Sequence, residues 1–83
     1  MAVKININGH TEQLEDIDLA SLQEAVGGYI EAIYQGAGMK TGEVMLVNEE
    51  GLLMSLPSNP TATTIAGQYV VGNAVLLAPG EFV

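Results

Sequence analysis

Few residue types in this chain could carry out covalent chemistry. It contains no Cys and a single His, His10, so neither a Cys–His pair nor a His-rich metal site can form within one copy. Its Ser residues lie in no nucleophile-elbow motif. Asp16 and Asp18 could share a cation, but two carboxylates beside a helix start more often cap the helix and complement its dipole. We therefore expect no enzyme activity, no catalytic residue, no metal site and no cofactor.

Residues suited to holding a small ligand are easier to find. Hydroxyl and amide side chains gather at residues 58–64, where the free N–H groups of a helix start would favour an anion such as phosphate. The glycine-rich stretch 36–42 would let the backbone approach a ligand closely, and it carries one of the two Lys residues. Tyrosines could stack on a nucleobase. The candidate ligand-binding residues are Asn59, Thr61, Thr63, Thr64, Lys40, Tyr29 and Tyr34.

Each candidate also has a purely structural interpretation. Asn59 and Thr61 could simply start a helix, the glycines could simply turn the chain, and the tyrosines could fill the core. The net charge of −8 opposes free attraction of anions. Charges beyond ~8 Å are screened at physiological salt, however, so a local cluster of donors could still hold a phosphate. The residues alone leave this choice open.

The charge balance excludes ordinary nucleic-acid binding. Ten acidic residues stand against Lys4 and Lys40, with no Arg, so no basic patch can neutralise phosphates. Several acids crowd one short stretch, which raises the idea of a protein that imitates DNA: Glu12, Glu15, Asp16 and Asp18. Such a mimic needs phosphate-like charge along a long surface. A solvated acidic edge is the more typical meaning of this pattern.

The composition predicts one small domain that self-associates. The 83 residues leave room for a single domain, 1–83, with a small stability margin. Charged residues make up 14% and hydrophobic residues 48%, so some apolar side chains must lie on the surface or in a contact between copies. We expect a homo-oligomer. The absence of Cys, of an apolar signal core and of a membrane-spanning stretch predicts a cytoplasmic location.

The first half of the chain predicts a hairpin followed by a helix. Apolar and polar residues alternate over 3–8, as in a half-buried strand, and Asn8 before Gly9 is a strong hairpin signal. Residues 11–17 form the return strand, whose acids place it at an edge of the sheet. Asp18 can cap a helix over 19–26, with an alternative capping box at Ser21 to Glu24. Two glycines then end the helix.

The second half predicts strands around a short helix. Asn59 and Pro60 resemble an N-cap and first helical position, so a short helix over 61–66 would end at Gly67. The predicted strands are residues 29–34, 43–47, 52–56 (strand or extended segment) and 69–77, the last with a turn or bulge at Gly72-Asn73. This order predicts an α+β fold: a small, mainly antiparallel sheet with one longer and one short helix packed on it.

Three motifs carry a resemblance to a known family. They are VGGYIE at 26–31, NEEGLLMSLPSNPTAT at 48–63 and VGNAVLL at 71–77. In this order, over about residues 19–77, the chain resembles a domain-of-unknown-function family of small proteins from bacteriophages, plasmids and other mobile elements. The resemblance implies a phage-type accessory protein made inside a bacterium, and it carries no catalytic residues to this chain.

That context leads to a functional hypothesis. Small, non-catalytic phage proteins commonly counter host defence, and we expect this one to sequester a nucleotide immune signal, such as a cyclic oligonucleotide or an NAD-derived nucleotide. The site would combine the helix start at Asn59, Lys40 and a tyrosine at a boundary between subunits, where two copies can enclose a pocket. The alternatives are an acidic inhibitor that binds a basic host protein through residues 12–18, and a structural or regulatory phage module without a small ligand.

Overall fold

A computed structural model describes residues 1–82 of the chain. Within these residues it contains five strands and two helices, in the order β-β-α-β-β-α-β. Their bounds are β1 Ala2–Ile5, β2 Thr11–Leu14, α1 Leu19–Val26, β3 Ile30–Ile33, β4 Val44–Asn48, α2 Pro60–Ala66 and β5 Ala74–Leu77. The predicted α+β fold, with one longer and one short helix on an antiparallel sheet, is confirmed.

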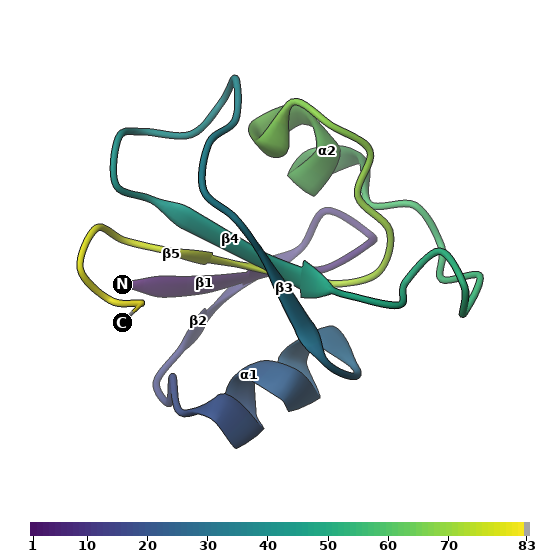
Figure 1. Cartoon of the computed structure of the whole chain (residues 1–83), viewed down its shortest axis with the longest axis horizontal. Helices are drawn as coiled ribbons and strands as arrows, with labels where there is room; N and C mark the ends of the chain where they lie inside the picture. Colours follow the sequence, from purple (N-terminus) through teal and green to yellow (C-terminus); the bar gives the residue numbers. More distant parts are fainter. Residues whose placement is uncertain (83) are drawn as a thin grey trace.

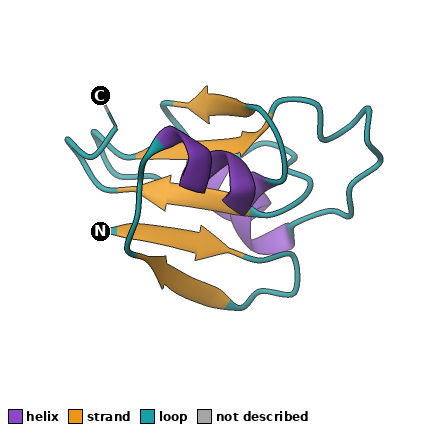
Figure 2. Cartoon of the chain, turned by 90° about the horizontal axis from the view of Figure 1, so that it is seen from below, coloured by secondary structure: helices purple, strands orange, loops and turns teal. Residues whose placement is uncertain are grey.

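All five strands form one antiparallel sheet in the order β2-β1-β5-β4-β3. The C-terminal strand β5 therefore lies at the centre, between β1 and β4, while β2 and β3 occupy opposite margins (Figure 2). In the register of the central pair, Met45 faces Leu76 and Leu46 faces Val75. Placing the last strand in the middle makes the sheet depend on contacts between distant parts of the sequence.

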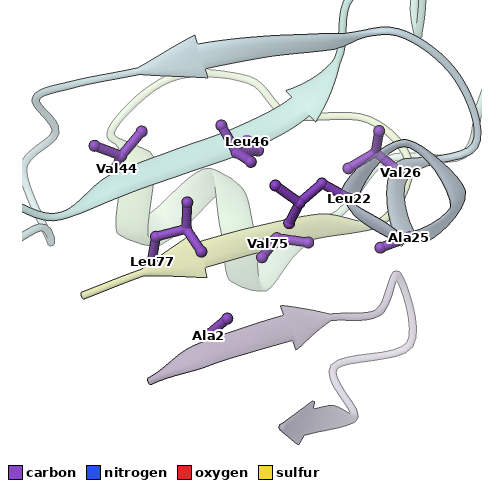
Figure 3. Close-up of a cluster of buried hydrophobic side chains, with 8 residues drawn as sticks. All are labelled: Ala2, Leu22, Ala25, Val26, Val44, Leu46, Val75 and Leu77. Atoms are coloured by element: carbon purple, nitrogen blue, oxygen red, sulfur yellow. The ribbon is translucent and has the colours of Figure 1, made fainter. Parts of the chain in front are cut away.

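A helix covers each face of the sheet (Figure 1). On one face, α1 packs through Leu22 and Val26 against side chains of β4 and β5, including Leu46 and Val75 (Figure 3). On the other face, Ala62 and Ala66 of α2 belong to a second apolar cluster with residues of all three central strands. Because both faces are covered, every residue of β4 is buried, which explains why its first four residues are all apolar.

Both ends of α1 carry the predicted capping residues. The Asp18 carboxylate accepts a hydrogen bond from the Ser21 backbone N–H at 2.8 Å, which lowers the pKa of Asp18 because the bond favours its ionised form. At the other end, Gly27 has a φ of 83° and donates its N–H to the carbonyl of Gln23. Asp18, rather than Ser21, is therefore the cap.

The cap of α2 is also a junction between three parts of the fold. Asn59 is 0% exposed, and its Oδ1 accepts a hydrogen bond from the Ala62 N–H at 3.1 Å. Its Nδ2 donates to the carbonyls of Ile5 and Gly72, both at 2.9 Å. The three bonds tie the start of α2 to the end of β1 and to the segment that enters β5.

Three predicted strands are shorter or absent. The return strand predicted over 11–17 ends at Leu14, where the chain turns toward α1. Residues 52–56 are not a strand: this run coils into successive turns, in which Met54 N–H donates to the Glu50 carbonyl and Leu56 N–H to the Gly51 carbonyl. The turns leave Leu52 and Leu53 exposed. Of the predicted strand 69–77, only β5 is regular. Before it, Val71 makes a single antiparallel bridge with Ser58, and Gly72 turns the chain with a φ of 76°.

Replacing Asn59 should cost more stability than replacing an ordinary helix cap. Asn59→Ala removes the cap and leaves the Ile5 and Gly72 carbonyls without their partner, so we expect a loss of about 3 kcal/mol in the free energy of unfolding. Asn59→Asp keeps the acceptor but sets a carboxylate against two carbonyls, so it should be at least as destabilising. Urea denaturation measures both effects. Exposed Thr64→Ala is the matched control, and a loss below about 1 kcal/mol for Asn59→Ala would contradict this role.

Candidate functional site

The structure uses the predicted helix start for internal hydrogen bonds. Asn59 is buried with both amide hydrogens and its oxygen occupied. Thr63 Oγ1 accepts from the Val70 N–H at 2.9 Å and donates to the Val70 carbonyl at 3.3 Å. Thr64 Oγ1 donates to the Pro60 carbonyl at 3.0 Å. Thr61 is half-buried, with its hydroxyl near Gly9 of the β1–β2 hairpin. Binding by these residues stays a prediction, and a ligand there would compete with the fold.

Lys40 lies away from this helix start, near the opposite end of α2. The loop that carries it, residues 36–42, packs on the C-terminal half of the helix: the Gly38 N–H donates to the Ile65 carbonyl at 2.8 Å. Glu43 Oε1 accepts from the Lys40 backbone N–H at 2.6 Å and so shapes the end of the loop. Within one copy, the structure therefore places these two parts of the predicted site apart; their meeting across a boundary between copies stays a prediction.

A groove runs along the margin of the sheet at β3, on the face that α2 covers. We name it the β3 groove; it has a volume of about 660 Å³, within the roughly 300–1,000 Å³ of small-molecule sites. It lies between the margin strand, the turns that follow β4, and the segment that leads from α2 toward β5. Its lining is made of residues 31–35, 47–49, 51–53 and 68–71.

Tyr34 connects the β3 groove with Lys40. This tyrosine is 64% exposed and lines both the groove and a smaller hollow of about 220 Å³. The hollow, which we name the Lys40 hollow, is formed by residues 34–36 and 39–42. A planar ring stacked on Tyr34 would thus lie next to the hollow that Lys40 helps to form. Of the predicted site residues, the structure brings these two together.

The two remaining tyrosines lie differently with respect to this groove. Tyr69, which is 66% exposed, lines the β3 groove together with Tyr34, although the two come from segments far apart in the sequence. Tyr29 is equally exposed but stands just before β3, five residues and roughly 16 Å of extended chain from Tyr34. Within one copy, Tyr29 does not line the β3 groove.

The polar lining of the groove consists of carboxylates and amides. Glu31 is opposite Val47 in the β3–β4 register, so its side chain lies on the α2 face, and Glu49 lines the same groove. Gln35 and Gln68 add amide donors and acceptors. The sequence reasoning did not select these four residues. The two-residue period of β3 was the signal that could have placed Glu31 on this face.

The side chains that line the groove are suited to recognition of a polar ligand. Carboxylates and amides can accept or donate hydrogen bonds to hydroxyl and amino groups, and two tyrosines offer flat apolar surface. Among residues 1–82, no three His, Asp or Glu side chains are grouped closely enough to hold a metal ion. In the same range, every buried side-chain N or O atom has a hydrogen-bond partner. No helix in this part of the chain is long and apolar enough to cross a membrane.

The acids of residues 12–18 gather at the opposite margin of the sheet. Glu12 of β2 is exposed and pairs with Lys4 across the strands at 3.7 Å, while Glu15 and Asp16 extend into solvent beyond the strand. A shallow hollow of about 430 Å³ lies beside them, between β2 and α1. The predicted solvated acidic edge is therefore separated from the β3 groove by the width of the sheet.

The fold and the groove are those of a small α+β domain with a ligand-sized depression at a sheet margin. The chain matches the family described as Domain of unknown function (DUF3846) over residues 2–83, and it belongs to this family. The predicted membership in a domain-of-unknown-function family is thereby confirmed, and the match extends beyond the predicted stretch to include the N-terminal hairpin. No curated protein and no solved structure matches the chain.

The position of Lys40 depends on a close approach that only glycine permits. A Cβ at Gly36 would lie 2.7 Å from the carbonyl carbon of Ala66, inside van der Waals contact with backbone atoms. We expect Gly36→Ala to push the loop off α2 and to destabilise the protein by about 1–3 kcal/mol, as overpacking does. Chemical denaturation measures the loss. Thr41→Ala, in the exposed part of the loop, should be near neutral; equal stability of both variants would contradict this packing.

Proposed function

We propose that this protein is a non-catalytic binding protein that sequesters a nucleotide-type small molecule in the β3 groove. The observation that carries the proposal is the position of Tyr34, which lines both the groove and the Lys40 hollow. A base stacked on Tyr34 inside the groove would direct its phosphate toward the ammonium group of Lys40. The amides and carboxylates of the groove would then bind the amino and hydroxyl groups of base and ribose.

The charge of the groove limits which nucleotides fit. One Lys serves the phosphate end, while Glu31 and Glu49 line the other part and would repel additional phosphates. A ligand with one or two negative charges and exposed amino or hydroxyl groups suits this distribution. Cyclic dinucleotides and ADP-ribose derivatives have this character, whereas a longer polyphosphate does not. This reasoning supports a signalling nucleotide as the ligand class.

The family resemblance supplies the biological setting of the proposal. The motifs VGGYIE and NEEGLLM, on which the resemblance rests, contribute Glu31, Asn48, Glu49 and Leu52 to the groove. We propose that the protein is a phage-type accessory factor, acting in the bacterial cytosol. Removing a nucleotide immune signal there would counter host defence.

The acidic margin supports a second candidate, an inhibitor that binds a basic host protein. Glu12, Glu15 and Asp16 are exposed together at and beyond β2, where a basic surface could approach them. Binding of this kind weakens as salt rises, because it depends on charge complementarity. A nucleotide-binding protein would instead gain thermal stability from specific nucleotides.

A thermal-shift screen tests the nucleotide proposal directly. Cyclic di-AMP, cyclic di-GMP, cyclic tri-AMP and ADP-ribose are added to the purified protein, and the recovered nucleotide is checked by mass spectrometry. A ligand at about 100 times its Kd stabilises by about 2.7 kcal/mol, or about 10–20 °C for a domain of this size. We expect such a shift from one class, with the nucleotide returned intact. No shift from any of them favours the acidic inhibitor, and altered nucleotide contradicts a non-catalytic role.

Matched variants test the location of the site. Tyr34→Ala removes the stacking surface and should weaken binding by about five- to 150-fold, since stacking on an aromatic contributes about 1–3 kcal/mol. Lys40→Ala should weaken binding of the phosphate-bearing ligand but not of its nucleoside. Thr64→Ala, at the exposed face of α2, is the control and should bind normally. The reverse outcome, loss with Thr64→Ala and not with Tyr34→Ala, would move the site to the helix start.

A further inference from the structure

The two margins of the sheet differ in how well they are protected from pairing with another strand. At one margin, β2 has the sequence TEQL, and acids follow it directly. At the other, β3 has the sequence IEAI, with one charged residue and an exposed Tyr on each side. Strands at a margin present unpaired N–H and C=O groups, and charged residues normally discourage pairing there. The β3 margin is therefore the one open to a further strand.

We propose that β3 pairs antiparallel with β3 of a second copy, and that the partner's Tyr29 completes the β3 groove. The part of this inference that concerns ligand binding rests on the proposed function. The pairing itself depends on the β3 strand and not on any ligand.

Charge selects the register of this pairing. A two-fold axis perpendicular to the sheet keeps the α2 faces of both copies on the same side and sets residues of equal parity opposite one another. An axis through Glu31 would place two carboxylates directly opposite, which is destabilising. An axis through Ala32 sets Glu31 opposite the partner's Ile33, and Ile30 opposite the partner's Tyr34. The second register avoids directly opposed carboxylates.

This register brings the partner's Tyr29 to the groove. Counting outward from Ala32, position 29 of one copy is opposite position 35 of the other, so the partner's Tyr29 lies beside Gln35. Tyr29 shares the parity of Glu31, whose side chain lies on the α2 face, and directly opposed residues point to the same face. Because Gln35 and Tyr34 line the β3 groove, the partner's Tyr29 would become its third aromatic wall. A planar ring could then be held between tyrosines of two copies.

The distribution of charge and apolar surface favours a second copy as the occupant. Each copy carries a net charge of −8, yet the densest acids, Glu12 to Asp18, lie at the β2 side, so two copies can meet at β3 with these charges far apart. Tyr29 and Tyr34 are about two-thirds exposed. With about 200 Å² for each whole side chain, the four tyrosines of a dimer expose about 500 Å² in the separate copies. The contact would bury part of this area, and the paired backbone would add to it, toward the ~1,000 Å² that a specific interface needs.

A disulfide placed on the two-fold axis tests the pairing without any ligand. The chain has no Cys, so Ala32→Cys introduces one thiol per copy. Opposed Cα atoms in an antiparallel pair are about 4.5–5.5 Å apart, within the range that a disulfide spans. With diamide as the oxidant, we expect Ala32→Cys to form a covalent dimer, whereas Thr11→Cys on β2 stays monomeric. Equal, low cross-linking of both variants would overturn the pairing.

Mixing two binding-deficient variants tests the shared groove. Binding capacity for ADP-ribose and for cyclic di-AMP is measured by calorimetry on Tyr29→Ala, on Tyr34→Ala and on an equal mixture of the two after re-association. In a mixed dimer, one groove keeps Tyr34 of its own copy and Tyr29 from its partner. We expect each variant alone to bind poorly and the mixture to recover about one quarter of the wild-type capacity, because random pairing makes about half of the dimers mixed.

The outcomes separate this inference from the proposed function. Normal binding by Tyr29→Ala, or no recovery in the mixture, would overturn the shared groove while leaving the nucleotide proposal in place. If the wild-type protein binds neither nucleotide, the proposed function fails for these ligands and the shared groove fails with it. The cross-linking of Ala32→Cys still decides whether the copies pair through β3.

Discussion

The buried amide of Asn59 is the interaction on which the rest of the structure depends. Its three hydrogen bonds join the start of α2 to the last residue of β1 and to the carbonyl of Gly72, just before β5. These segments are far apart in the sequence, and β5 occupies the centre of the sheet. The amide uses two donors and one acceptor in these bonds. Loss of any one bond would leave a buried polar group without a partner, which is costly in the interior. The same bonds hold α2 in place, and the loop of residues 36–42, which carries Lys40, packs on this helix.

This constraint explains where a binding site can lie. Both faces of the central strands are covered by helices, so the small interior is filled with apolar side chains and with the Asn59 junction. Open surface that is both apolar and hollowed therefore remains at the β3 margin, where Tyr34 and Tyr69 line a groove. The acids of residues 12–18 lie at the other margin, at and beyond β2. The sheet thus separates its densest group of carboxylates from the groove that the tyrosines line.

Local patterns predicted much of the fold but not the assembly of the site. Asp18, Asn59 and the glycines after both helices specify helix ends through local hydrogen bonds, and these predictions are confirmed. The run 52–56 was predicted as a strand from its apolar residues, whereas the turn bonds that follow Asn48 coil it into an exposed loop. For the site, sequence selected Tyr34 and Lys40, but the meeting of Tyr34 with Tyr69 and Glu49 depends on pairing between distant strands. No periodic pattern in the local sequence indicates these contacts.

We propose that Asn59 supports the fold while the groove at β3 binds the ligand. The most direct measurement is an NMR titration of the ¹⁵N-labelled protein with ADP-ribose and with cyclic di-AMP, following the backbone amide signals. We expect the largest shifts at Tyr34, Gln35 and Tyr69, with the Lys40 loop also affected and with Ala62 unchanged. Shifts centred on residues 59–64 would contradict this account, because they would place the ligand at the helix start that Asn59 already occupies.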